Sequence, residues 1–169
     1  TGYYLSVILV FSLFTAFILM LQGGYGSFGK ALLDSVFQVV SFISTTGFGN
    51  ADNALWPMLA NVFLIFAAFH CGCSGSTTGG IKIDRILIAF KAIGHEIRHR
   101  LHPSEVSHVR MSGQHLSDGS VKAVMMYIVT YFLLTFMSII IVMLCGETAT
   151  EAVSGVIASI GSVGPGLGE

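Results

Sequence analysis

Three long apolar runs without Asp, Glu, Lys or Arg constrain this chain more than any other feature of its sequence. They cover residues 3–21, 54–73 and 123–145. A helix rises 1.5 Å per residue, so a run of about 20 residues matches the roughly 30 Å hydrocarbon core of a bilayer. The composition agrees, because 53% of the residues are hydrophobic and only 10% are charged, against about 25% charged residues in a soluble domain. We therefore predict an all-α integral membrane protein with three spans.

The basic residues indicate which ends of the spans face the cytoplasm. Seven of the eight Lys and Arg residues lie between the second and third spans. Since cytoplasmic loops are enriched in Lys and Arg, the positive-inside rule places residues 82–122 in the cytoplasm and the other loops outside. Nucleic-acid binding is the rival explanation, but this segment has few interleaved aromatic residues. We expect a multi-pass protein of the plasma membrane or cell inner membrane, with no nucleic-acid partner.

Two apolar segments in the outer loops are too short to cross a bilayer. Residues 31–43 and 149–160 each begin near an acid, Asp34 or Glu151, and each leads into a Gly-rich strip. An acid is stabilised near the positive N-terminal end of a helix. Apolar segments of this length are typical of re-entrant half-helices.

These half-helices and their strips form an internal repeat. They align without gaps at an offset of 117 residues, which pairs Asp34 with Glu151 and Gly47 with Gly164. A full span precedes each copy, and a further span follows the first. Chance similarity of two apolar stretches ending in Gly is the alternative, but internal symmetry is typical of transport proteins.

The Gly-rich strips have the chemistry expected of an ion filter. Non-helical backbone at membrane depth is tolerated where it lines a watery cavity or is buried in protein. Gly permits backbone angles that turn carbonyl oxygens toward one ion, and such carbonyls replace the hydration shell of potassium. The hydroxyls of Thr45, Thr46 and Ser162 either contribute to this site or cap the local backbone.

A third Gly-rich segment interrupts the second span near its inner end. It covers residues 71–82 and leads into an amphipathic helical pattern that begins at Ile81. The break either lines the cavity below the strips or lets helices approach closely as a packing kink. It is not a nucleotide-binding loop, because Ile81 separates Gly80 from Lys82 and no Ser or Thr follows Lys82.

Three motifs in this order resemble one known family. They read TTGFG at 45–49, GSTTGGIK at 75–82 and GSVGPG at 161–166. The chain is similar to the Trk/Ktr/HKT superfamily of potassium transporters, and most similar to bacterial Trk-type membrane subunits. This resemblance implies four span–re-entrant pore helix–span repeats around a pseudo-fourfold cation pore. The chain would hold the third repeat with a cytoplasmic helix extension (1–101), a cytoplasmic linker (102–122) and a truncated fourth repeat (123–169).

Residue by residue, the resemblance implies a selectivity filter and a gate. The filter residues would be Thr45, Thr46, Gly47, Phe48, Ser162, Val163, Gly164 and Pro165, and the gate would contain Gly72, Gly75, Gly79 and Gly80. Because the two strips differ in sequence, a strictly fourfold filter is not expected. The resemblance also implies potassium as the transported ion held by the filter residues, no cofactor, a homodimer in the lipid membrane and a cytosolic nucleotide-binding regulatory subunit. Residues 96–118 are a candidate docking segment.

The remaining functional classes have less support in the sequence. We expect no enzyme, because no nucleophile–base pair or pair of carboxylates is evident. The alternative function is a secondary transporter of another cation or small solute that uses broken helices. Such a transporter needs an ionisable residue within the membrane, and the spans offer only His70. A histidine bonded to backbone within the helix bundle explains that residue more simply.

Overall fold

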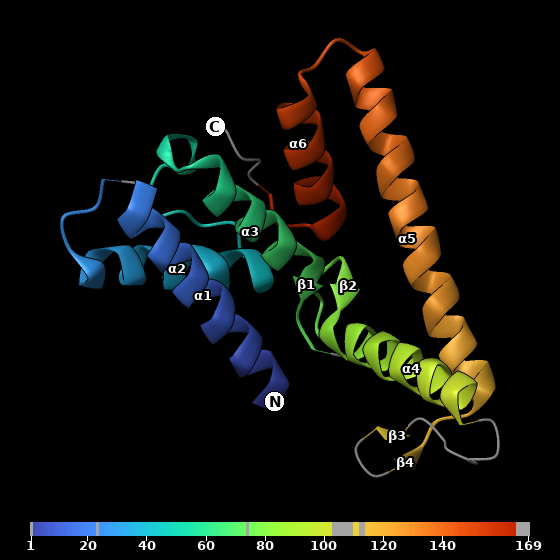
Figure 1. Ribbon diagram of the computed structural model, residues 1–169. Helices are drawn as coiled ribbons and strands as arrows, with labels where there is room; N and C mark the ends of the chain where they lie inside the picture. The colour runs from blue at the N-terminus through green and yellow to red at the C-terminus, as the bar shows by residue number, and fades with distance from the viewer. Residues whose placement is uncertain (1, 23, 74, 103–109, 112–113, 165–169) are drawn as a thin grey trace.

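The computed structural model describes residues 2–22, 24–73, 75–102, 110–111 and 114–164, and most of these residues are helical (Figure 1). The helices are α1 (Gly2–Gln22), α2 (Phe28–Ile43), η1 (Asn53–Leu55), α3 (Met58–Phe69), α4 (Ile83–Leu101), α5 (Asp118–Leu144) and α6 (Ala149–Gly161). Two pairs of very short strands accompany them. The strands β1 (His70–Cys71) and β2 (Ile81–Lys82) are parallel, and β3 (Arg110–Met111) and β4 (Gln114–His115) are antiparallel.

Among the described residues, α1 and α5 are long and apolar enough to cross a membrane. The helix in the second predicted span is shorter than expected, because α3 has only 12 residues. Its start is set by Pro57, which stands at the N-cap. Its end is set by His70, whose backbone leaves helical geometry and pairs with Ile81 across the β1–β2 ladder. The helix α5 begins at Asp118, five residues before the uncharged run of residues 123–145.

The hydrophobic core lies where α1, α2, α3 and α6 meet, so it joins the first and last parts of the chain. Figure 1 shows α1 crossing α2, with α3 and α6 beside each other. Small residues on α3 let these helices approach closely. Trp56, which precedes Pro57 at the start of α3, is also buried in this core at 7% exposure. The buried members are Ile18, Leu19, Ala31, Val39, Phe42, Ile43, Trp56, Ala60, Leu64, Ala67, Ala68, Ile157, Ala158 and Val163.

The helices α4 and α5 extend away from this core. In Figure 1, α4 runs from β2 to the foot of the long α5, and α6 returns alongside α5 toward α3. Tyr131 and Thr135 are the only residues of α5 that are buried against the described part of the chain. The Gly-rich loop between β1 and β2 therefore lies at the junction between the core and the α4–α5 arm.

Candidate functional site

The first strip begins at a helix end whose geometry is well defined. The N–H of Thr46 donates to the carbonyl oxygen of Ser41 (2.9 Å), and the N–H of Thr45 donates to that of Phe42 (3.2 Å). This pair of bonds is the Schellman motif, which needs a left-handed residue just after the helix. Thr45 takes that role with φ of 54°, and Gly47 follows with φ of 76°.

The second strip repeats this geometry at the end of α6. The N–H of Val163 donates to the carbonyl oxygen of Ala158 (2.8 Å), and the N–H of Ser162 donates to that of Ser159 (3.1 Å). Ser162 has φ of 56° and Gly164 has φ of 105°. Every bond and every positive φ thus recurs at the offset of 117 residues that the sequence alignment predicts. The last predicted filter residue, Pro165, lies outside the described residues.

Two side chains of α2 hold the part of the chain that follows the first strip. One carboxylate oxygen of Asp34 accepts a hydrogen bond from the Asn50 amide (2.8 Å), and the other accepts one from the Tyr25 hydroxyl (3.1 Å). The amide of Gln38 donates to the carbonyl oxygen of Ala51 (2.9 Å). Asp34 and Gln38 are buried, so their hydrogen bonds to the following chain are formed inside the protein. Burial and the bond to Asp34 raise the pKa of Tyr25.

The prediction that Asp34 lies at the N-terminal end of a half-helix is wrong. The helix α2 begins at Phe28, so Asp34 lies beyond the first turn and is not an N-terminal charge. The expectation is confirmed for Glu151, which forms a capping box with Thr148 in the first turn of α6. Hydrogen bonds from the Thr148 side chain and backbone lower the pKa of Glu151. The sequence contains a signal for this role of α2, because Asp34 and Gln38 are large polar residues one turn apart in a mostly apolar segment.

The side chains of the strips differ in their surroundings. The hydroxyl of Thr46 lies 2.7 Å from that of Ser44, so it has a local partner. Val163 occupies the equivalent place in the second strip and is buried in the core at 2% exposure. Phe48 is 72% exposed. The backbone geometry of the strips is therefore shared, whereas their side chains are not.

The Gly-rich loop is held at both ends. The parallel pairing of β1 and β2 closes it, and the N–H of Ile83 donates to the carbonyl oxygen of Gly72 (3.3 Å). Within the loop, the hydroxyls of Ser76 and Thr78 lie 2.7 Å apart, and the Lys82 ammonium donates to the carbonyl oxygen of Ser76 (2.7 Å). Lys82 therefore has a partner within this chain.

Three glycines of the loop are closely packed, and a Cβ at each would lie less than 3 Å from a neighbouring atom. A Cβ at Gly72 would lie 2.8 Å from the Ser76 hydroxyl oxygen, and one at Gly80 would lie 2.6 Å from the Cys71 sulfur. A Cβ at Gly79 would lie 2.6 Å from the carbonyl oxygen of Gly161, at the end of α6. The loop thus packs directly against the start of the second strip. Gly75 differs, since its φ of +91° requires glycine although nothing lies within 4 Å of its Cβ position.

His70 and the cysteines have local roles in the structure. The Nδ1 atom of His70 lies 2.8 Å from the carbonyl oxygen of Phe66, as a backbone-bonded histidine would. Cys71 is buried, and Cys73 and Cys145 are exposed, all as free thiols. Within the described ranges, no group of three or more His, Cys, Asp or Glu residues is placed to hold a metal ion.

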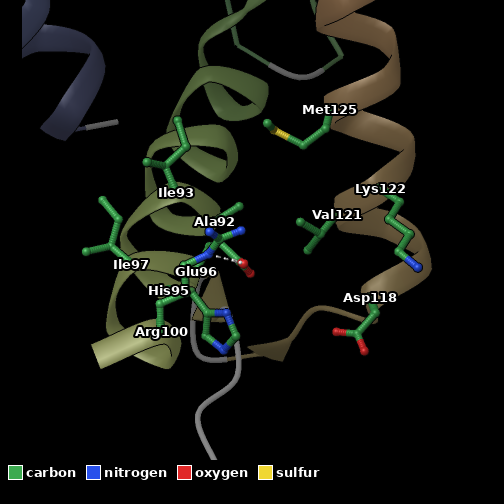
Figure 2. A pocket seen from close by; sticks show the side chains of 10 residues that line it. All are labelled: Ala92, Ile93, His95, Glu96, Ile97, Arg100, Asp118, Val121, Lys122 and Met125. Carbon is green, nitrogen blue, oxygen red and sulfur yellow. Dashed lines mark hydrogen bonds and ion pairs between the residues drawn. The ribbon is translucent and has the colours of Figure 1, made fainter. Parts of the chain in front are cut away.

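A separate cavity of about 670 Å³ lies between α4 and α5, distant in the chain from both strips. Figure 2 shows Val121 and Met125 pointing into it from α5, and the ion pair of Arg100 with Glu96 on α4. Because both members of this pair are largely exposed, it contributes little to stability. The cavity is lined by Ala92, Ile93, His95, Glu96, Ile97, Arg100, Asp118, Val121, Lys122 and Met125.

Comparison with known proteins agrees with the motifs. The family model described as TrkH, a cation transport protein, matches residues 3–169. The chain is 32% identical to the Trk system potassium uptake protein TrkH of Salmonella typhimurium over 165 residues, which is 98% of the chain and 34% of that protein. It is 39% identical to the protein of that name from Halomonas elongata over 140 residues, or 83% of the chain and 29% of that protein. The chain therefore spans about a third of the length of these curated relatives.

The fold agrees as well. The crystal structure of the potassium transporter TrkH from Vibrio parahaemolyticus matches with a TM-score of 0.90 and 31% sequence identity, over 99% of this chain and 36% of that one. The family model and the relatives together show a transporter rather than an enzyme. The chain belongs to the TrkH family of cation transport proteins.

Proposed function

We propose that this chain forms part of a pore through which potassium is taken up across the membrane. In this proposal, the backbone carbonyl oxygens of residues 45–48 and 162–165 line the selectivity filter and hold the ion. Two further span–pore helix–span repeats complete a pseudo-fourfold ring around the pore. The names of the relatives, which are potassium uptake proteins, support potassium as the ion.

The observation that carries this proposal is the matched backbone of the two strips. Each follows the C-terminal end of a short helix, and each has positive φ at its first and third residues, Thr45 and Gly47 or Ser162 and Gly164. The C-terminal end of a helix carries partial negative charge. Two such ends, each continued by a non-helical strip of backbone, suit a site for a bare cation better than a site for an anion.

We further propose that residues 72–80 form a gate below the filter. The packing of Gly79 against the end of α6 places this loop next to the second strip. Gly72, Gly75, Gly79 and Gly80 let the chain turn tightly in this position. Movement of the loop away from α6 would then open the path for the ion.

We also propose which segment faces the cytoplasm and which partners the protein has. Residues 82–122 hold seven of the eight Lys and Arg residues and face the cytoplasm. A cytosolic nucleotide-binding subunit would dock on residues 96–118, near the cavity of Figure 2. The membrane subunit would act as a homodimer. We place the protein in the plasma membrane or cell inner membrane.

The alternative, a secondary transporter, has less support from the contacts. Coupling to a second ion needs an ionisable group that is free to change partners. His70 bonds to backbone, and both carboxylate oxygens of Asp34 accept hydrogen bonds from neighbouring side chains. These contacts favour structural roles for the two residues.

The test is ion flux through the full-length protein in liposomes, measured with potassium, sodium and caesium. We expect potassium flux in the wild type and a lower potassium-to-sodium ratio in Gly47→Ala and Gly164→Ala, because an L-residue is strained at their positive φ. Gly94→Ala is the matched control, since nothing lies within 4 Å of its Cβ position in α4. Absence of cation flux, or an unchanged ratio in both strip variants, would contradict the filter.

A further inference from the structure

A side chain from α5 reaches the Gly-rich loop across a large distance in sequence. The hydroxyl of Tyr127 donates to the carbonyl oxygen of Gly80 (3.3 Å), and 47 residues separate the two. Gly80 is the last residue before β2 and has φ of +67°. The bond therefore fixes one carbonyl at the point where the loop rejoins regular structure.

The ring of Tyr127 has a second partner, on α4. The guanidinium carbon of Arg85 lies 3.9 Å from the centroid of the ring, within the range of a cation–π contact. Arg85 lies in the first turn of α4, shortly after Gly80 in the chain. The residues on both sides of β2 thus hold the same aromatic side chain, one at its hydroxyl and the other at its face.

The loop is also packed too closely for a Cβ at either of its last two glycines. A Cβ at Gly79 would meet the Gly161 carbonyl oxygen at 2.6 Å, and one at Gly80 would meet the Cys71 sulfur at 2.6 Å. The segment from Gly79 to Gly80 therefore contacts Tyr127 on α5, the end of α6 and Cys71. A loop packed so closely moves as a unit, and that movement requires the bond to Tyr127 to break.

We propose that Tyr127 is a positioning residue that keeps the loop in its closed place, and that Arg85 orients Tyr127 for this task. The inference rests on the proposed gate, and it adds the element that controls it. The helix α5 begins at Asp118, at the end of the segment that we place in the cytoplasm. A shift of α5 or α4 at that side is transmitted through the Arg85–Tyr127 pair to the Gly80 carbonyl, so the pair connects cytoplasmic events to the loop.

The first experiment compares potassium flux through full-length wild type and Tyr127→Phe in liposomes. The substitution keeps the ring and removes only the hydroxyl, so we expect the flux to rise about fivefold, the effect of losing one ordinary hydrogen bond from the closed state. The potassium-to-sodium ratio should not change, because the strips are untouched. Arg85→Gln should raise the flux in the same direction, and Arg85→Lys, which keeps a cation over the ring, should restore most of the wild-type value.

Tyr131→Phe is the matched control for this experiment. Tyr131 lies one turn further along α5 and has ring contacts with Phe69 and Phe132. Among the described residues its hydroxyl makes no hydrogen bond, so its loss should not alter the flux. An equal rise in both Tyr variants would overturn the proposal, because the effect would then be general to α5.

A second measurement does not depend on transport. In a full-length protein that retains Cys71 as its sole thiol, this thiol is buried against Gly80. We expect Tyr127→Phe to speed the modification of Cys71 by a small maleimide about fivefold, because the loop leaves its closed place more often. A faster modification without any potassium flux in the wild type would support the loop contact and contradict the proposed transport function. Unchanged modification of Cys71 in Tyr127→Phe would overturn the inference whatever the flux.

Discussion

Thr45 and Ser162 have left-handed backbones although neither is glycine, with φ of 54° and 56°. This conformation is unusual for any side chain and is an outlier for a β-branched residue such as Thr. It costs an L-residue about 1–2 kcal/mol. The Schellman bonds at the ends of α2 and α6 maintain it at both positions. Strained residues of this kind concentrate at functional sites, and here they occupy matching places in the two strips.

Replacement of Thr45 by Gly tests this strain. We expect Thr45→Gly to leave the free energy of unfolding unchanged or to raise it by about 1 kcal/mol, because relief of the left-handed strain offsets the added freedom of the unfolded chain. Thr46→Gly is the matched control. It should lower the free energy of unfolding by about 1 kcal/mol, since Thr46 has no positive φ and loses its contact with Ser44. Thermal unfolding of the full-length protein in detergent measures both, and equal destabilisation by the two variants would contradict the strain.

At this scale the sequence predicted the glycines better than the other residues. Gly47 and Gly164 were expected to need unusual backbone angles, and both have positive φ. The same conformation at Thr45 and Ser162 could not be predicted, because residue type argues against it and only the helix-end hydrogen bonds impose it. The hydrogen bond from Tyr127 to Gly80 could not be predicted either, since 47 residues separate the two in the sequence.

At the scale of elements, α2 and α6 end alike but support their strips differently. The helix α2 reaches the residues after its strip through Asp34 and Gln38. The positions of α6 that match these two are Glu151, which caps its own helix, and Gly155, which has no side chain. The second strip is held by the burial of Val163 instead. A repeat in sequence has therefore diverged in the way that it anchors the strips.

The bond between Asp34 and Asn50 should determine how firmly the first strip is held. We expect Asp34→Ala to lower the free energy of unfolding by about 2 kcal/mol, because hydrogen bonds to a charged group are lost at a buried site. Asn50→Ala should have a smaller effect, and the double variant should be less destabilised than the sum of the two, by about 1 kcal/mol. Strictly additive effects in denaturant unfolding would show that the pair does not interact.

Asp52→Asn is the control for that experiment. Asp52 caps η1 through the N–H of Ala54, a task that Asn performs equally well. We therefore expect no change in stability. The potassium-to-sodium ratio should fall in Asp34→Ala and not in Asp52→Asn, because only the former releases the chain that follows the first strip.

Elements that depend on local sequence were easier to predict than elements that depend on tertiary contacts. Uncharged apolar runs locate α1 and α5, because length and hydropathy alone decide such helices. The break after α3 was visible in its glycines, but its details were not. The β1–β2 pair has only two residues in each strand, and the loop that it closes packs against the end of α6. Tertiary contacts of this kind leave no periodic pattern in the sequence.

At the scale of the whole molecule, the chain has a core and a long exposed arm. The core joins α1, α2 and α3 to the end of α6. The arm of α4 and α5 leaves many large apolar side chains uncovered, including Phe136 at 62% and Leu144 at 81% exposure. Such surface suits lipid or further helices of a larger transporter. Four of the eight Lys and Arg residues, Arg85, Lys91, Arg98 and Arg100, lie on α4, and Arg110 and Lys122 follow them in β3 and near the start of α5.

This distribution of charge predicts the sidedness of the protein. Residues near 115 should lie in the cytoplasm and Cys145, at the other end of α5, should lie outside, because 27 helical residues reach about 40 Å and separate the two ends by a full bilayer. Both positions are exposed. A full-length protein that retains Cys145 as its sole thiol should react with a membrane-impermeant maleimide added to intact cells.

The complementary variant has Cys145→Ser and His115→Cys and should react only in inverted vesicles or after permeabilisation. The physical reason is the cost of moving the Lys- and Arg-rich segment outward, against the bias that retains such loops in the cytoplasm. Labelling of His115→Cys from outside intact cells would reverse the orientation. The Arg85–Tyr127 contact would then transmit signals from the external face, and a cytosolic regulatory subunit could not act through it.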